Sequence, residues 1–295
     1  MKLSDHEGKG EIAMYTDAQL HVWEADRPDR PWDHNQKPQL PEPFTIDRAL
    51  ALMDAHGVDR AVLVPPLVSG FNNTTANAYA LEGAAAHPDR LAVMGRFDPR
   101  TADAHERLEH WLEQPGMRGV RFSLEGPPAP QLLEEGALRW FWPEAERLGV
   151  AVYLLRPGRP DVIAAVAERY PALRIAANHL SLGGTRSPEV LAAHIDLLAS
   201  LVPHQNVCVV ISSLALSSQA GYPYADIHDS IRRVYDLFGA SRLAWGTDFT
   251  ASRGRLGETV AYAHLRDFVD VALPNLSADE RDAIFNGTIS RTLGW

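Results

Sequence analysis

The sequence predicts a single (β/α)8 barrel, and three observations lead to this prediction. Apolar, β-branched runs of strand length recur along the chain, and segments with a 3.6-residue hydrophobic period separate them. Eight such runs suit a closed barrel better than an open sheet, because alternating strands and helices form right-handed parallel units. The chain of 295 residues can bury one large core, and no linker or change in composition divides it.

The elements follow in order along the chain. The expected strands are Tyr15–Val22, Ala61–Pro65, Leu91–Phe97, Gly119–Ser123, Val150–Leu155, Arg174–Ala177, Val207–Ser212 and Leu243–Gly246. The helical patterns between them include Thr74–Ala86, Ala102–Gln114, Ala137–Leu148, Asp161–Arg169, Pro188–Leu201 and Tyr224–Phe238. Helices commonly end at a glycine, and Gly57, Gly149 and Gly239 stand where helix ends are expected.

The remaining segments complete the expected organisation. Residues 1–13 are polar and are expected to form a flexible tail, and residues 14–295 are expected to form the barrel. Glu24–Pro43 is rich in Pro, Asp and Arg. We expect it to be a long loop over the barrel mouth, since long loops in compact domains tend to be functional.

Composition excludes several classes of protein. A net charge of −10 and a pI near 5.6 argue against binding to nucleic acid or to an anionic membrane. The sequence contains no apolar run of membrane-spanning length, and its first dozen residues lack the apolar core of a signal peptide, so a cytoplasmic protein is expected. Cys208 is the only cysteine, which excludes an intrachain disulfide and a zinc site of clustered cysteines.

Lysine is nearly absent, and this excludes lysine chemistry in the barrel. Lysine occurs only at positions 2, 9 and 37, and none follows Glu42. A Schiff-base lysine, a carbamylated lysine bridging two metals and a phosphate-loop lysine are therefore all excluded from the barrel.

Three candidate catalytic residues stand at the carboxyl ends of expected strands, where barrel enzymes carry their chemistry. His21 follows the first strand, with Gln19 pointing the same way, and His179 follows the sixth. Asp248 follows the last strand after Gly246. An isolated histidine there can instead fill the core, and an isolated aspartate can cap a helix. Three such groups at one mouth favour a catalytic site.

These segments resemble the amidohydrolase-related family in order and spacing. The resemblance rests on Asp17–Trp23, Gly119–Phe122, Asn178–Leu180, Trp245–Asp248 and the closing segment Asn286–Trp295. It covers nearly the whole chain. The family branch contains pyrone-dicarboxylate lactonase, sugar lactonases, muconolactone hydrolases and aromatic-acid decarboxylases, so the resemblance implies a barrel hydrolase.

The resemblance implies a metal site that this chain fills only in part. Metal-binding members use two first-strand histidines, a fifth-strand histidine, often a sixth-strand histidine and the last-strand aspartate. His21, His179 and Asp248 match and would be the ligands of a zinc or manganese ion if one is bound. Gln19 replaces one histidine, and Arg156 stands after the fifth strand, which has none. A neutral amide is a poor zinc ligand and an arginine repels a cation, so we expect a metal-independent site with no required cofactor.

The expected mechanism is hydrolysis of a lactone. Asp248 would take a proton from water, and His179 and His21 would hydrogen-bond the developing oxyanion. Arg121 and Arg156 would bind substrate carboxylates, although an ion pair and an exposed loop position are their structural alternatives. The other expected substrate-binding residues are Gln19, Trp23, Asn72, Ser123 and Ser212.

The sequence therefore predicts a carbon–oxygen hydrolase that opens a small carboxylated ring compound in catabolism. A metal-assisted decarboxylase or hydratase of a carboxylated aromatic is one alternative. A barrel that has lost catalysis and only binds a ligand is another. The expected partner is an anionic small molecule, and a homodimer is the default oligomeric state for a soluble enzyme.

Overall fold

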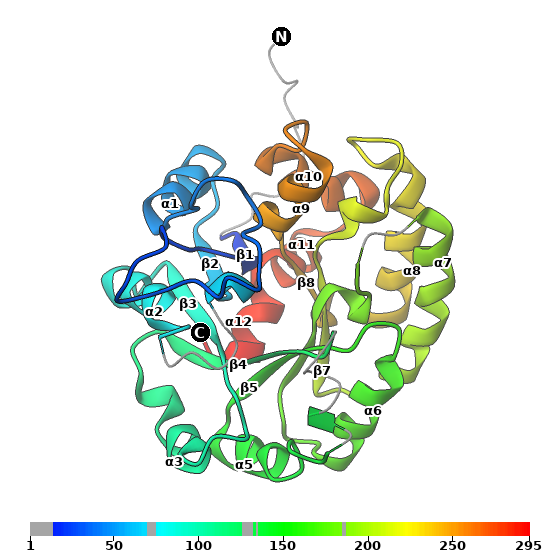
Figure 1. Cartoon of the computed structure of the whole chain (residues 1–295). Helices are drawn as coiled ribbons and strands as arrows, with labels where there is room; N and C mark the ends of the chain where they lie inside the picture. Colours follow the sequence, from blue (N-terminus) through cyan, green and yellow to red (C-terminus); the bar gives the residue numbers. More distant parts are fainter. Residues whose placement is uncertain (1–13, 70–74, 126–131, 134, 185–186) are drawn as a thin grey trace.

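The computed structural model describes residues 14–69, 75–125, 132–133, 135–184 and 187–295. Its centre is a sheet of eight parallel strands in the order of the sequence, each hydrogen-bonded to the next. Figure 1 shows the strands at the centre of the molecule with the helices around them. The strands are β1 (Thr16–Leu20), β2 (Arg60–Leu63), β3 (Leu91–Arg96), β4 (Met117–Ser123), β5 (Ala151–Leu155), β6 (Ile175–Ala177), β7 (Val207–Ile211) and β8 (Leu243–Trp245).

The helices of the described residues form the outer layer. They are α1 (Ile46–Ala55), α2 (Ala78–Ala86), α3 (Ala104–Glu109), α5 (Phe141–Leu148), α6 (Pro160–Arg169), α7 (Pro188–Leu197), α8 (His228–Phe238), α9 (Phe249–Leu256), α10 (Tyr262–Ala272), α11 (Ala278–Asp282) and α12 (Thr288–Leu293). Within the described ranges, no helix is long and apolar enough to cross a lipid bilayer.

The predicted (β/α)8 fold is confirmed, and the differences lie at the ends of helices and strands. The helix expected over Ala102–Gln114 is shorter, because α3 ends at Glu109 and a 3-10 turn, Trp111–Glu113, follows. The indole N–H of Trp111 donates to the carbonyl of Gly119 at 3.0 Å, which ties this turn to β4. Tertiary contacts of this kind shift helix ends by a few residues relative to the periodic pattern.

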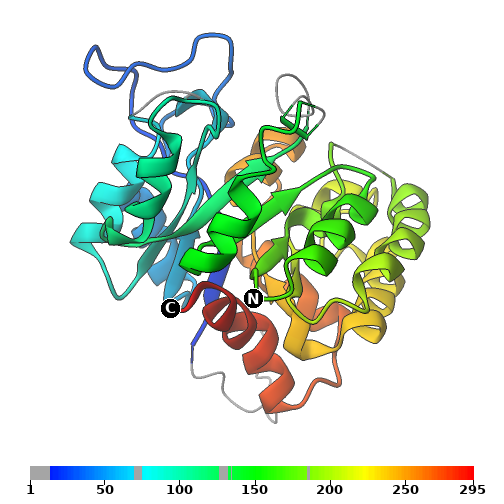
Figure 2. The same ribbon diagram turned by 90° about the horizontal axis from the view of Figure 1, so that it is seen from below.

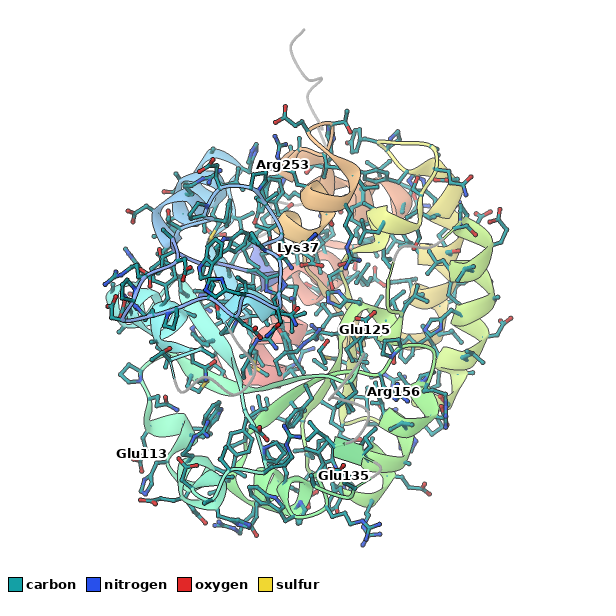
Figure 3. All side chains as sticks on the ribbon, viewed as in Figure 1. Lys37, Glu113, Glu125, Glu135, Arg156 and Arg253 are labelled. Atoms are coloured by element: carbon teal, nitrogen blue, oxygen red, sulfur yellow. The ribbon has the colours of Figure 1, made fainter. Side chains whose placement is uncertain are left out.

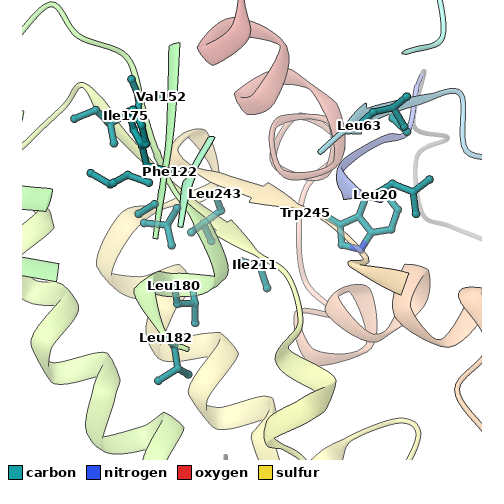
Figure 4. Close-up of a cluster of buried hydrophobic side chains, with 14 of the residues drawn as sticks. Leu20, Leu63, Phe122, Val152, Ile175, Leu180, Leu182, Ile211, Leu243 and Trp245 are labelled. Carbon is teal, nitrogen blue, oxygen red and sulfur yellow. The ribbon is translucent and has the colours of Figure 1, made fainter. Parts of the chain in front are cut away.

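The strands alternate their side chains between two apolar layers. One face packs against the helices, and Figure 4 shows part of this layer, including Leu63, Phe122 and Trp245. The other face fills the barrel interior with mostly small side chains, such as Ala18 and Ala176. The barrel interior is therefore a packed core, so a ligand can bind only at an end of the barrel.

The two ends of the barrel are closed differently. Ile289 and Leu293 of α12 pack with the interior side chains and plug the amino-terminal end. Figure 2 shows α12, in red, at one end of the molecule and the loop over residues 24–43, in blue, at the other. Where β8 returns to β1, the amide N–H of Asp248 donates to the carbonyl of Gln19 at 2.9 Å and brings the two edges of the sheet together.

Candidate active site

A cavity of about 120 Å³ lies at the carboxyl ends of the strands, and a residue on or just after each of the eight strands lines it. Three of the lining residues are the predicted catalytic ones, His21, His179 and Asp248. The structure thus brings together in one pocket three side chains that lie far apart in the chain. The other lining residues from the strand ends are Val64, Arg96, Arg121, Ser123, Leu155 and Ser213.

His21 is held by hydrogen bonds on both ring nitrogens. Its Nδ1 lies 2.6 Å from the carbonyl oxygen of Val64 and donates to it, because a carbonyl only accepts. Its Nε2 lies 3.1 Å from the side-chain nitrogen of Gln19, whose oxygen accepts from the Asn178 amide at 2.7 Å. The Gln19 amide faces Nε2 with its nitrogen, and turning both amides over would present its oxygen instead, so the Gln19–Asn178 pair can act as donor or acceptor to this nitrogen.

Asp248 faces His21 across the pocket. Its Oδ1 lies 3.3 Å from Nε2 of His21 and accepts no other contact from the residues that the structure describes, whereas its Oδ2 accepts from the hydroxyl of Ser213. Burial raises the pKa of Asp248, but the contact with His21, the charges of His179 and His21, and the Ser213 hydroxyl together hold it below its usual value. Asp248 is therefore ionised near neutral pH, with one oxygen available to take a proton.

His179 has a backbone conformation that residues other than glycine rarely adopt. His179, Leu180 and Ser181 have φ values of 51°, 55° and 55°, and the left-handed region is costly for residues other than glycine. Its Nδ1 lies 2.8 Å from the hydroxyl of Ser212 and 3.2 Å from that of Ser213. Because Ser213 gives its proton to Asp248, it can only accept from His179. Strained backbone of this kind clusters at functional sites.

Two buried arginines, Arg96 and Arg121, stand beside these groups. They occupy paired positions on β3 and β4, and each is 5% exposed. Among the described residues, neither forms an ion pair with a carboxylate, and Nη1 of Arg121 has no acceptor. Burial lowers the pKa of Arg96 to about 9 and that of Arg121 to about 10, so both remain charged at neutral pH. The pocket therefore offers two positive charges that no described carboxylate contacts directly, although Asp248 and Glu125 act on Arg121 from a distance.

The other predicted substrate-binding residues lie at different places. Ser123 lines the pocket, whereas Gln19 and Ser212 are buried behind His21 and His179. Arg156 does not line the cavity; its Nη1 donates to the carbonyl of Leu124 at 3.1 Å, and Figure 3 shows it towards α6. Trp23 lines a separate small cavity. Asn72 lies outside the described residues.

Sequence reasoning missed several residues that line the pocket. Arg96 closes an otherwise apolar strand pattern, and a charged residue at the carboxyl end of a barrel strand was the available signal. Gln39 belongs to the loop expected over the mouth and lines the pocket. Nothing in the local sequence distinguishes Ser213 from Ser212, and only the fold shows which hydroxyl faces the cavity. Glu125 and Arg255 complete the polar rim.

The donor set was compared with the needs of a divalent metal. Nε2 of His21 and Oδ1 of Asp248 lie 3.3 Å apart, and these two atoms would be two of the ligands. Zinc sites use at least three protein ligands, and the described ranges contain no group of three or more His, Cys, Asp or Glu side chains able to hold a metal. The described residues therefore do not fit a complete metal site.

The fold and this site define a (β/α)8-barrel enzyme whose acid–base groups and cations meet at the carboxyl ends of the strands. A family model for amidohydrolases matches residues 16–295, and the chain belongs to this hydrolase family. This finding confirms the resemblance seen in the sequence.

Comparisons with known proteins give three informative matches. The chain is 28% identical over 252 residues to an L-fucono-1,5-lactonase of Burkholderia ambifaria, covering 83% of this chain and 84% of the relative. It is similar to the crystal structure of a Burkholderia multivorans amidohydrolase with bound zinc, at a TM-score of 0.79 and 21% identity, over 96% and 99% of the two chains.

The third match is a probable 2-pyrone-4,6-dicarboxylic acid hydrolase from Acinetobacter baumannii with citric acid bound. Its TM-score is 0.73 at 19% identity, and the match covers 95% of this chain and 99% of that one. These two structural likenesses support the fold.

Proposed function

We propose that this protein hydrolyses the ring ester of a small carboxylated lactone, with Asp248 as general base and without a metal. The observation that carries the proposal is the pair of buried arginines, Arg96 and Arg121, in the same cavity as Asp248, His21 and His179 and with no ion pair to a described carboxylate. Buried cations that lack a paired carboxylate are costly to folding, so a ligand anion is the natural partner. The lactonase relative and the pyrone hydrolase neighbour support ring-ester hydrolysis in general.

In the proposed reaction, the substrate carboxylate binds Arg121 and Arg96. Arg96 thus replaces Arg156, which we expected in this role from the sequence but which does not line the cavity. Asp248 Oδ1 accepts a proton from water, and the water oxygen attacks the lactone carbonyl carbon. His179 and His21 hydrogen-bond the resulting oxyanion. The ring C–O bond then breaks, and the proton on Asp248 passes to the leaving ring oxygen, which opens the ring to a hydroxy acid.

The direct test is a panel of lactones assayed with purified protein. We expect ring opening of lactones that carry a carboxylate and much weaker activity on the same rings without it. Arg96→Met and Arg121→Met should each raise KM for the carboxylated lactone by about 10- to 100-fold, as loss of a charge-assisted hydrogen bond implies. Arg156→Met is the matched control and should leave KM unchanged. No hydrolysis of any lactone would overturn the proposal.

Metal analysis tests the second part of the proposal. We expect activity to survive dialysis against a chelator, with less than stoichiometric zinc or manganese in the purified protein. Stoichiometric metal together with activity lost to chelator would overturn the metal-independent mechanism. Metal-dependent release of carbon dioxide from a carboxylated aromatic, with no ring opening of lactones, would assign decarboxylation instead.

The citric acid bound to the Acinetobacter protein motivates a simple binding test. If the cations of this pocket serve a substrate carboxylate, citrate should compete with the carboxylated lactone. Competition that disappears in Arg96→Met and Arg121→Met, but persists in Arg156→Met, supports the assignment. Citrate inhibition of equal strength in all of these proteins would contradict it.

A further inference from the structure

Asp17 is a buried carboxylate outside the cavity that the mechanism above does not use. It lies on β1, is 0% exposed and does not line the pocket. In the part of the chain that the structure describes, it forms no ion pair, and burial raises its pKa to about 6. An apolar side chain would fill this place at lower cost, since a buried charge is unfavourable even when it is hydrogen-bonded. Core packing therefore does not explain why an aspartate occupies this position.

The hydrogen bonds of Asp17 join three elements at the seam where β8 returns to β1. Its Oδ1 accepts from the backbone N–H of Gln19 at 3.1 Å and of Thr247 at 2.8 Å. Its Oδ2 accepts from the hydroxyls of Thr247 at 2.5 Å and of Tyr262 at 2.9 Å. These donors belong to β1, to the turn between β8 and α9, and to α10. One carboxylate thus accepts hydrogen bonds from four donors on three elements.

Both segments that Asp17 holds depart from regular geometry next to the proposed catalytic groups. The pairing of β1 with β2 shifts register between Asp17 and Leu20, and a bulge of this kind redirects side chains. Gln19 lies in that bulge and bonds to His21. In the other segment, Thr247 precedes Asp248, whose φ is 47° and thus in the left-handed region. Asp17 binds the residue that orients His21 and the residue that precedes the base.

We infer that Asp17 is a positioning residue, which sets Asp248 and the Gln19–His21 pair at their mutual distance by bracing the β1 bulge against the turn after β8. The inference rests on the proposed function, because it assigns Asp17 a task in that same site. Asp17 touches no substrate. Its effect is on the 3.3 Å separation of Oδ1 of Asp248 from Nε2 of His21. A small error in such a distance lowers the rate of the chemical step more than it weakens substrate binding.

Kinetics of graded variants test the inference. Asp17→Leu removes every acceptor and should lower kcat by about 30-fold or more, with KM within about threefold, because Arg96 and Arg121 stand on β3 and β4. Asp17→Asn keeps an oxygen for the two backbone N–H groups and should restore part of that rate. Thr247→Val removes one hydroxyl donor and should give an intermediate loss; it and Asp17→Asn carry the test if Asp17→Leu does not fold.

Thr16→Val is the matched control. Thr16 is the neighbour of Asp17 on β1, is equally buried and also makes a side-chain hydrogen bond, to Asn286 at 3.0 Å. That bond leads away from the seam, so kcat should stay within about twofold of the wild type. A loss of kcat in Thr16→Val equal to that in Asp17→Asn would overturn the inference, as would wild-type kcat in Asp17→Leu.

Crystal structures separate this inference from the proposed function. In Asp17→Asn and Thr247→Val, the Asp248 carboxylate and the Gln19 amide should move relative to their wild-type positions. Positions identical to wild type in both variants would overturn the positioning role, whatever the reaction is. A wild-type protein that opens no lactone, with these side chains displaced in the variants, would overturn only the proposed function.

Discussion

Three arginines in this barrel are equally buried, and their surroundings differ by location. Arg281 is 6% exposed, contacts the carboxylate of Asp270 through Nη1 and lies 3.3 Å from the hydroxyl of Tyr15, just before β1. Arg96 and Arg121 are each 5% exposed, at the mouth, with no carboxylate bound among the described residues. Within the described residues, the buried cation at one end of the barrel has a carboxylate ion pair, and the two at the other end have none.

The two ends of the barrel also differ in their backbone conformation and in their packing. The amino-terminal end is plugged by apolar side chains of α12. The mouth holds left-handed residues after β6, β7 and β8, including His179, Ser213 and Asp248. Backbone strain and buried charges without an ion pair both lower the stability of the folded protein. Their concentration at the mouth is typical of a functional site. The experiments below test whether this contrast is functional.

The largest effect is expected from the base. Asp248→Asn replaces the proposed general base with a neutral amide that cannot take a proton from water, while keeping the size of the side chain. We expect kcat on an active lactone to fall by about 1,000-fold or more, in the range seen when an essential general base is lost. The measurement is steady-state kinetics, with circular dichroism to show that the fold is kept. Turnover within tenfold of the wild type would assign the base to another residue.

The next effect tests the two kinds of arginine directly. Arg281→Met breaks a buried ion pair and leaves the carboxylate of Asp270 without its cation, which should cost about 3 kcal/mol of unfolding free energy. Arg121→Met removes a cation that has no carboxylate partner, so its effect should be near zero or stabilising. Urea unfolding at neutral pH measures both. Equal destabilisation by the two substitutions would show that Arg121 is satisfied by the protein after all.

The sequence predicted the barrel because hydrophobic periodicity is local and was regular over most of the chain. It also predicted that His21, His179 and Asp248 share one mouth, since each follows a strand. The roles of these residues stay predictions that the experiments above must test. Their placement required only the rule that strand ends of a barrel converge.

The rest of the site depends on features that a sequence does not show. Arg96 and Arg156 both stand at strand ends, and only the packing around them decides that one faces the cavity and the other lies beside it. The proposed positioning role of Asp17 depends on a register shift in β1 and on a hydrogen bond to Thr247, which lies 230 residues later in the chain. Long-range hydrogen bonds of this kind leave no local pattern.

The pH dependence of stability distinguishes Asp17 from the paired charges elsewhere. Burial raises its pKa in the folded protein to about 6, from an ordinary value of 3.8. The folded state therefore holds this proton more tightly than the unfolded chain does. The stabilisation is fully present below about pH 4 and is lost as the pH rises through 6, at a cost of about 3 kcal/mol.

Asp17→Asn cannot ionise, so its stability relative to the wild type should rise by up to about 3 kcal/mol between pH 4 and pH 7. Urea unfolding at four pH values in this range measures the difference, and any lost hydrogen bond adds only a constant offset. Thr16→Val is again the control and should differ from the wild type by the same amount at each pH. A difference for Asp17→Asn that does not change with pH would contradict a buried, ionised carboxylate at this position.

The smallest effect is the stabilisation of the protein by a simple dianion. If Arg96 and Arg121 bind a ligand carboxylate, succinate at ten times its dissociation constant should stabilise the folded protein by about 1.4 kcal/mol. For a chain of this size, that is a rise in Tm of about 2–4 °C.

Succinamide is the neutral control, and sodium chloride holds the ionic strength constant so that general screening does not contribute. The rise should vanish in Arg121→Met and persist in Arg281→Met, because Arg121 has no carboxylate ion pair among the described residues, whereas Arg281 is paired with Asp270. An equal rise in both variants would mean that the anion binds elsewhere on the surface, and the contrast between the two ends would then describe the folding of the chain without identifying its ligand.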